Sequence, residues 1–258
     1  MTSSENLEVT TGKVATIEMR RPPDNYIDVP LLIEIVDALK ALAAAGETRA
    51  VVLCSAGKHF CAGVNFGGGT PATDASPTVP QRHLYDVALE LNRQPLPIVA
   101  AVQGAAVGGG LGLALAADFR VAAAEARFSA NFSRLGFHHG FGLSITLPAL
   151  VGQQRALRML YTGARISGET ALGWGLCDEL ASLDQLRATA LALAGEISAS
   201  APLAIQSIRE TMRADLRSRV EGAMAHERAE QDRLRRTDDW QEGLAATRER
   251  RTANFIGR

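Results

Sequence analysis

Glycines interrupt an apolar stretch at residues 99–120, where the sequence reads VAAVQGAAVGGGLGLALAADFR. Gly108, Gly109 and Gly110 are consecutive, and Gly112 follows. Glycine inside a helix or strand costs roughly 0.5–1 kcal/mol relative to alanine. Where a strand leads into a helix, the first backbone N–H groups have no intrahelical partner and carry the positive end of the helix dipole. The triplet therefore indicates either a backbone donor site for an anion or polarised carbonyl, or close helix–strand packing.

Two kinds of phosphate-binding loop are excluded at this triplet. The chain contains no G-x-x-x-x-G-K-[ST] sequence, and Leu113 interrupts a G-x-G-x-x-G pattern that would begin at Gly108. A dinucleotide or nucleoside triphosphate site is therefore not expected here.

A second glycine turn, GKHFCAGVNF at residues 57–66, directly follows the predicted strand at residues 50–55. With it, the sequence resembles the enoyl-CoA hydratase/isomerase, or crotonase, superfamily. Four segments in the same order carry the resemblance and together span almost the whole chain: RPPDNYIDVPLL, AVVLCSAGKHFCAGVNF, PIVAAVQGAAVGGGLGLALAADFRVAAAEARFS and RTDDWQEGLAATRERRTANF.

The resemblance implies an α/β fold built as a spiral of ββα units, and an acyl-coenzyme A thioester as ligand. Its carbonyl oxygen would lie between the backbone N–H groups of Val64 and Gly109, next to Gly63 and Gly108. Lys58 matches the position that meets the coenzyme phosphates, and the Ala62 and Val64 carbonyls match those that meet the adenine. Coenzyme A would enter as part of the substrate, without a further cofactor.

Hydratases of this family use two glutamates, and neither is present. Gly112 stands at the first position and Phe132 at the second. Each positioned acid or base contributes typically about 10²–10⁴-fold to rate, so we predict that standard water addition is slow or absent. We also expect Gly112 to leave a roomy pocket, with Phe132 and Phe137 lining it. The alternatives are isomerisation, hydrolysis or decarboxylation, or a non-catalytic acyl-CoA-binding subunit.

Histidines are the first substitutes to consider for the missing glutamates. His138 and His139 are the candidate acid/base pair, because they fall near the pocket in the family pattern and histidine titrates near neutral pH. Adjacent side chains usually diverge, so at most one should point inward; the alternative is a structural or surface pair. His59 is expected at the surface, and His226, on a charged helix, is not expected to be catalytic.

Further polar side chains lie in segments that the family places near the site. His83, Tyr85 and Asp86 begin a predicted helix, either as catalytic groups or as a solvated face. Asn131 and Ser129 can position water or a carbonyl. Cys61 is either a nucleophile or, as we favour, a small buried cysteine.

The elements that must position these residues alternate in type. Strands are predicted at residues 14–19, 50–55, 97–102 and 119–124, and helices at residues 28–46 and 81–93. Asp28 can cap the first helix and Gly46 can end it. A long Gly- and Pro-rich loop is predicted at residues 65–80. We expect an α/β core over residues 1–198 and a helical oligomerisation region over residues 199–258, with trimers or dimers of trimers implied by the resemblance.

Composition and charge argue against several classes of protein. With 27 Lys and Arg against 28 Asp and Glu, the formal charge is −1, so neither nucleic acid nor an anionic membrane is an expected partner. No uninterrupted apolar run reaches membrane-spanning length, and the first residues lack the apolar core of a secretory signal. Three cysteines without a CxxC pair fit a reduced, cytoplasmic protein and no zinc site.

Overall fold

The computed structural model describes residues 4–66 and 82–258. Its elements are, in chain order, β1 (Leu7–Thr10), β2 (Val14–Met19), α1 (Val29–Ala45), β3 (Ala50–Ser55), α2 (Leu84–Asn92), β4 (Ile98–Val102), β5 (Ala105–Val107), α3 (Gly109–Ala116), β6 (Phe119–Ala123), β7 (Arg127–Ser129), η1 (Asn131–Leu135), α4 (Leu143–Val151), α5 (Gln153–Thr162), β8 (Arg165–Ser167), α6 (Gly168–Trp174), β9 (Glu179–Ala181), α7 (Leu186–Ala199), α8 (Pro202–Leu234) and α9 (Asp238–Glu249). Most of the predicted loop at residues 65–80 lies outside the described residues.

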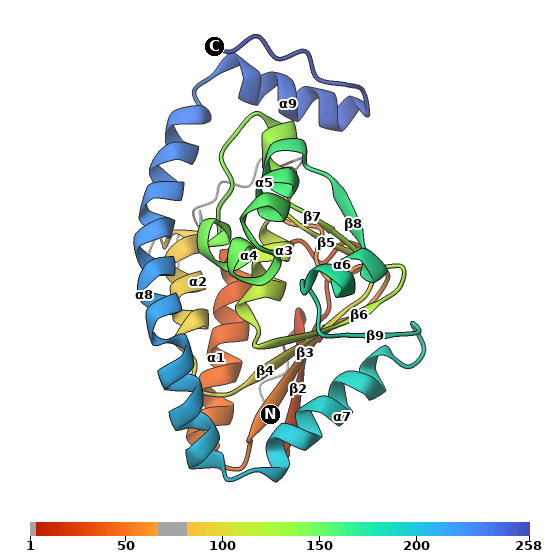
Figure 1. The fold of residues 1–258 in the computed structure, drawn as a ribbon, viewed down its shortest axis with the longest axis vertical. Helices are drawn as coiled ribbons and strands as arrows, with labels where there is room; N and C mark the ends of the chain where they lie inside the picture. Colours follow the sequence, from red (N-terminus) through yellow and green to blue (C-terminus); the bar gives the residue numbers. More distant parts are fainter. Residues whose placement is uncertain (1–3, 67–81) are drawn as a thin grey trace.

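Two sheets organise the α/β part of the chain. The larger has the order β1-β2-β3-β4-β6-β9, and only its β1–β2 pair is antiparallel. The smaller has the order β5-β7-β8, with β5 and β7 parallel and β7 and β8 antiparallel. Helix α7 covers one face of the larger sheet, and α1 and α2 lie toward its other face (Figure 1).

Successive side chains on a buried strand point to opposite faces of the sheet, and this alternation explains why helices cover both faces. On β3, Val52 and Cys54 pack with Leu186, Ala190 and the rest of the α7 cluster. The intervening Val51 and Leu53 belong to the main core. A strand buried on both faces reads as a continuous apolar run, which is how residues 50–55 read in the sequence.

Helix α1 begins and ends where its capping residues predict. The Asp28 side chain accepts a hydrogen bond from the Leu31 N–H, and Gly46 adopts a left-handed conformation with φ of 75°. Helix α1 thereby buries Leu32, Ile35, Val36 and Leu39 against the core.

The end of the chain is helical. Helix α8 runs along one side of the molecule, and α9 lies across one end of it (Figure 1). Among the described residues no single helix has the length and apolar composition of a membrane span, although α7 and α8, bent by 105° at their junction, pass that test together.

Candidate functional site

Backbone hydrogen bonds join the two glycine turns. The Cys61 N–H donates to the Ala105 carbonyl oxygen at 2.9 Å, and the Val107 N–H donates to the Cys61 carbonyl oxygen at 3.0 Å. Cys61 thus forms a single parallel bridge with Ala106 on β5. Because β5 leads into α3, this bridge places the turn at residues 61–64 beside the start of α3.

Glycines permit this close approach. A Cβ on Gly110 would lie 2.1 Å from the Cys61 carbonyl oxygen, and one on Gly63 would lie 2.8 Å from the Val107 carbonyl oxygen. Gly63 also has φ of 95°, a conformation that favours glycine. Close packing is therefore one reason for the glycines, and it serves to bring the two turns together.

Two backbone N–H groups at this junction have no hydrogen-bond partner in the part of the chain that the structure describes. Gly109 begins α3, so its N–H has no intrahelical partner, and within residues 4–66 and 82–258 neither it nor the Val64 N–H donates a hydrogen bond. A Cβ on Gly109 would lie 3.7 Å from Cγ2 of Val64, so the two residues are neighbours. Both face the same cavity. The chain thus presents two available donors to one space.

That cavity has a volume of about 280 Å³. Ala62, Gly63, Gly108 and Asn131, all predicted from the sequence, line it together with Val64, Gly109 and Phe132. Helix α9 supplies Leu244, Thr247 and Arg248 to its wall. Arg248 is fixed there by a 2.9 Å hydrogen bond from Nη2 to the Phe66 carbonyl oxygen.

The rest of the wall is aromatic. Phe137 packs against Phe132 at 5.5 Å between ring centroids, against Phe66 at 5.7 Å and against Trp240 at 4.4 Å. Trp240 comes from α9, so this cluster attaches α9 to the cavity. The expectation that Phe132 and Phe137 line the pocket is confirmed.

A smaller recess adjoins the cavity and shares Val64, Phe66, Gly109, Phe132 and Phe137 with it. Its volume is about 30 Å³. Its polar wall consists of Tyr85 from α2, Gln231 from α8 and Arg235, which directly follows α8. Of these three, only Tyr85 is a candidate from the sequence. The charged segment that contains Gln231 and Arg235 shows no local signal for a site.

Helix α2 does not present a solvated face at its start. His83 and Tyr85 are buried, whereas Asp86 is exposed. His83 caps α2 by accepting a hydrogen bond from the Tyr85 N–H, and its burial, with Arg228 nearby, lowers its pKa to about 4. Burial raises the pKa of Tyr85 well above its usual range. The Tyr85 hydroxyl therefore stays protonated at neutral pH.

The prediction of a roomy pocket at Gly112 is wrong. Gly112 does not line the cavity, since a Cβ there would lie 2.5 Å from Cβ of Phe141. Phe141 adopts φ of 63°, which is unusual for a bulky residue. Its ring fills the space that Gly112 leaves. Phe132, in contrast, does line the cavity.

Neither His138 nor His139 lines the cavity or the recess. Their rings stack at 4.1 Å instead of diverging as expected, because His138 Nδ1 bonds to the His139 carbonyl oxygen and His139 Nε2 bonds to Ser144 Oγ. Burial, then the neighbouring His138, lower the pKa of His139 to about 4. His139 also contacts the Phe132 ring at 6.5 Å between centroids.

The remaining candidates are structural or peripheral. Lys58 is exposed and does not line the cavity. Ser129 Oγ donates to the Gly163 carbonyl oxygen at 3.1 Å. Cys61 is fully buried, and burial raises the pKa of its thiol to about 12. Its interpretation as a small buried cysteine is confirmed. His59 is only half-buried, with Nδ1 accepting a hydrogen bond from the Ala105 N–H, and His226 is exposed.

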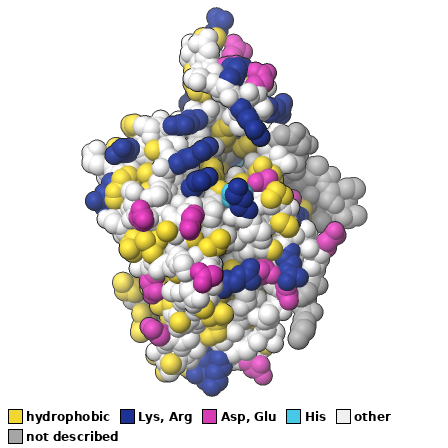
Figure 2. Space-filling model, turned by 90° about the vertical axis from the view of Figure 1, so that its right-hand side faces the viewer, with side chains coloured by type: hydrophobic (Ala, Val, Ile, Leu, Met, Phe, Trp, Pro, Cys, Tyr) yellow, Lys and Arg dark blue, Asp and Glu magenta, His cyan; other side chains and the backbone are white. Residues whose placement is uncertain are grey.

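Basic side chains are numerous at one end of the molecule. Figure 2 shows Lys and Arg side chains gathered in the upper part of one face, the end at which α9 lies in Figure 1. No cluster of His, Cys, Asp or Glu able to hold a metal ion occurs in the described part of the chain.

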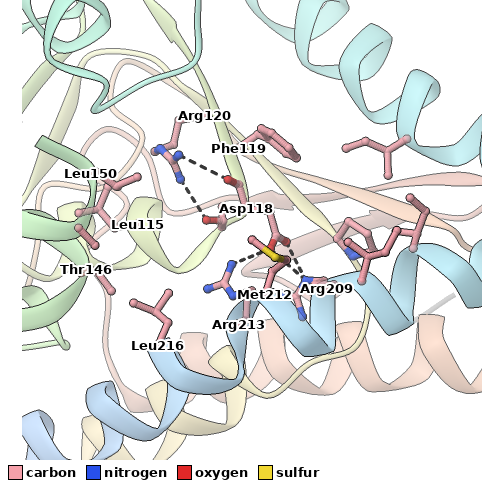
Figure 3. Close-up of a pocket in the computed structure, with 16 residues that line it drawn as sticks. Leu115, Asp118, Phe119, Arg120, Thr146, Leu150, Arg209, Met212, Arg213 and Leu216 are labelled. Atoms are coloured by element: carbon pink, nitrogen blue, oxygen red, sulfur yellow. Dashed lines mark hydrogen bonds and ion pairs between the residues drawn. The ribbon is translucent and has the colours of Figure 1, made fainter.

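A larger apolar groove, of about 400 Å³, lies elsewhere, between α8 and residues 115–120. Figure 3 shows Arg209 and Arg213 pointing from α8 toward Asp118 at its base. It contains neither of the two backbone donors described above, and so we assign it no part in the site.

Comparisons with known proteins agree on one family. The family model described as enoyl-CoA hydratase/isomerase matches residues 10–258. A probable enoyl-CoA hydratase of Rhodobacter capsulatus is 32% identical over 97% of both chains, and the (E)-benzylidenesuccinyl-CoA hydratase of Thauera aromatica is 30% identical over 97% of this chain and 98% of the relative. The crystal structure of an enoyl-CoA hydratase/isomerase from Pseudoalteromonas atlantica superposes with a TM-score of 0.88, at 26% identity, over 97% of this chain and 100% of that one.

Proposed function

Because this chain belongs to the enoyl-CoA hydratase/isomerase family, we propose that it stabilises the enolate of an acyl-CoA thioester with the backbone N–H groups of Val64 and Gly109. The observation that carries the proposal is that two backbone donors line one cavity and have no partner among the described residues. The dipole of α3 adds its positive end at Gly109. Losing one preorganised donor of this kind typically costs about 10²–10³ in rate.

The coenzyme would enter past α9. The proposed contacts are Lys58 and Arg248 with its phosphates and the Ala62–Val64 turn with its adenine. The gathering of Lys and Arg side chains at this end of the molecule supports the first contact (Figure 2). No cofactor besides the coenzyme A of the substrate is proposed.

The residues that line the cavity and the recess limit the reactions that we propose for this chain. No Asp or Glu is among the described residues that line the cavity or the recess. Water addition by a pair of carboxylates is therefore not proposed. Isomerisation, hydrolysis and decarboxylation each pass through a stabilised oxyanion, and decarboxylation needs no strong base because loss of CO₂ itself leaves the enolate.

The same absence of carboxylates favours a second candidate, a non-catalytic acyl-CoA-binding subunit. The position of His138 and His139 outside both spaces also favours it. The two candidates share the binding site and differ only in turnover.

The test measures binding and turnover together. Butyryl-CoA affinity is measured by calorimetry, and crotonyl-CoA, 3-hexenoyl-CoA and malonyl-CoA are followed by chromatography. We expect micromolar or tighter binding, slow or absent crotonyl-CoA hydration, and turnover of another ester. Binding without any turnover would favour the second candidate. Crotonyl-CoA turnover near the diffusional ceiling of about 10⁸ M⁻¹s⁻¹ would contradict the account.

We further propose a homotrimer or a dimer of trimers. The groove of Figure 3 supports a second copy as its cover, because Ile208 and Met212 at its edge are 58% and 76% exposed. Light scattering should give an assembly of three or six chains, and Met212→Glu should dissociate it. A monomeric wild-type chain would contradict this proposal.

A cytoplasmic location is proposed because Cys54, Cys61 and Cys177 are all free.

A further inference from the structure

The recess beside Val64 and Gly109 has an unusual distribution of polar groups. Most of its wall is apolar, and its polar side chains come from α2, from α8 and from the residue that directly follows α8. Tyr85 and Arg235 bring hydrogen-bond donors to it, and it contains no acidic side chain within the described part of the chain. Such a wall accommodates a hydrogen-bond acceptor, and most readily an anion.

Arg235 carries a charge that its neighbours balance only weakly. Its side chain is 27% exposed, and its one ion pair among the described residues joins Nη1 to Asp232 Oδ1 at 3.4 Å. Asp232 is itself 51% exposed, and solvent-screened pairs of this kind contribute little stability. The guanidinium is therefore available to a stronger partner in the recess.

The buried carboxylate in this region does not compensate Arg235. Glu227 is fully buried one helical turn before Gln231. Its Oε2 accepts the Gly142 N–H at 2.8 Å and its Oε1 accepts the Ser144 N–H at 3.0 Å. Both oxygens are thus occupied by the start of α4, and Glu227 does not line the recess.

Tyr85 has a proton to donate. Tyr85 borders the recess, and burial raises its pKa, so its hydroxyl is protonated at neutral pH. Gln231 is oriented by its own bond from Nε2 to the His138 carbonyl oxygen at 2.8 Å. A neutral phenol has one proton to donate, which a hydrogen-bond acceptor in the recess can receive.

We propose that the recess binds the terminal carboxylate of a short acyl group, held by Arg235 and the Tyr85 hydroxyl, so that the preferred ligands are CoA thioesters of small dicarboxylic acids. The inference rests on the proposed acyl-CoA function. A volume of about 30 Å³ admits a group of this size but no long chain. Because Val64 and Gly109 border both spaces, the carboxylate lies only a few bonds from the thioester carbonyl.

The test compares two esters of nearly the same shape. In malonyl-CoA a carboxylate follows the α carbon, and in isovaleryl-CoA two methyl groups replace its oxygens. Dissociation constants are measured by calorimetry, and chromatography verifies that the esters remain intact. A hydrogen-bonded charge contributes enough for a preference of about tenfold to a hundredfold. We expect the wild-type chain to bind malonyl-CoA more tightly by this factor.

Variants assign the preference to the recess. Arg235→Met should reduce the preference to about onefold by weakening malonyl-CoA alone, and Tyr85→Phe should reduce it in part. Arg233→Met is the matched control, since Arg233 lies on the same helix, is 63% exposed and pairs with Glu230; it should leave both constants unchanged. If Arg235→Met does not fold, as judged by its melting curve, Arg235→Gln takes its place.

Two results would overturn the inference while leaving the proposed function intact. One is equal or tighter binding of isovaleryl-CoA by the wild-type chain. The other is an equal loss of affinity for both esters in Arg235→Met. Failure of the wild-type chain to bind either ester would instead contradict the proposed function, and the inference with it.

Discussion

The ring of Phe141 fills the space beside Gly112, where a side-chain Cβ would lie 2.5 Å from Cβ of Phe141 and 2.6 Å from its Cγ. This contact leaves no room for a side chain at residue 112, where the resemblance to hydratases implies a glutamate. The glutamate cannot be restored at Gly112 without displacing Phe141, whose backbone is held in a left-handed conformation.

Gly112→Glu is therefore expected to destabilise the chain and to confer no crotonyl-CoA hydration. Overpacking a core costs about 1–3 kcal/mol, and burying an unpaired carboxylate adds to that cost. Urea unfolding and a hydration assay measure the two effects. Gly222→Glu is the control, because Gly222 is exposed on α8 and nothing lies within 4 Å of its added Cβ. A stable Gly112→Glu variant that hydrates crotonyl-CoA would show that the space beside residue 112 accepts a glutamate side chain, and would contradict this prediction.

Glu227 ties α8 to the start of α4 through its bonds from Gly142 and Ser144. Glu227→Ala leaves the buried Gly142 N–H and the half-buried Ser144 N–H without this acceptor. An unsatisfied buried donor costs about 1–3 kcal/mol, so we expect the unfolding free energy to fall by at least about that amount. Glu230→Ala, three residues along the same helix at a solvent-accessible ion pair with Arg233, should change it far less, because such pairs contribute little to stability. Similar losses in the two variants would contradict the role of Glu227.

His83 makes the stability of the fold depend on pH. Its pKa falls from 6.5 to about 4 on folding, because burial, and then Arg228, disfavour the charged ring. Between these values the unfolded chain binds the proton and the folded chain does not, so stability is lost as pH falls from about 6.5 toward 4.

His83→Asn should remove this contribution and retain the cap, since asparagine is a favourable N-cap residue. Urea unfolding at pH 7.5, 6 and 5 measures it. The wild-type unfolding free energy should decline more steeply with falling pH than that of the variant. His139 titrates in both chains and does not affect the comparison. Parallel pH profiles would contradict the assignment to His83.

Local signals in the sequence predict the first half of the fold closely. The strands at residues 14–19 and 50–55 match β2 and β3, and the caps Asp28 and Gly46 define α1. The three-residue strands β5, β7 and β8 carry no such signal. They form because the chain pairs residues far apart in sequence, and no period can be read from three residues.

Some features of the site could likewise be predicted from local sequence, whereas others depend on long-range packing. The glycines predict the cavity because their backbone requirements are local, and Ala62, Gly63, Gly108 and Asn131 lie where expected. The consequences of Gly112 depend on Phe141, which is brought there by long-range packing. Likewise, Gln231 and Arg235 join the recess only because α8 packs against α2. Contacts of this kind cannot be inferred from spacing along one helix.

The central claim is that the Gly109 N–H, together with that of Val64, polarises a thioester carbonyl. Gly109→Pro removes this single donor at the first position of a helix, where proline is tolerated. Gly109→Ala keeps the N–H, and its Cβ would meet Cγ2 of Ile27 at 3.3 Å and Cγ2 of Val64 at 3.7 Å, so it controls for added bulk. If the protein is an enzyme, turnover should fall about 10²–10³-fold in Gly109→Pro.

The most direct measurement is the infrared carbonyl stretch of bound butyryl-CoA, isotopically labelled at the thioester carbon. Hydrogen bonding to the carbonyl oxygen weakens the double bond, so the account predicts a shift to lower wavenumber on binding to the wild-type chain and to Gly109→Ala. The shift should be reduced in Gly109→Pro. A bound carbonyl that absorbs at the same wavenumber as free butyryl-CoA in water, or a shift unchanged in Gly109→Pro, would contradict the account.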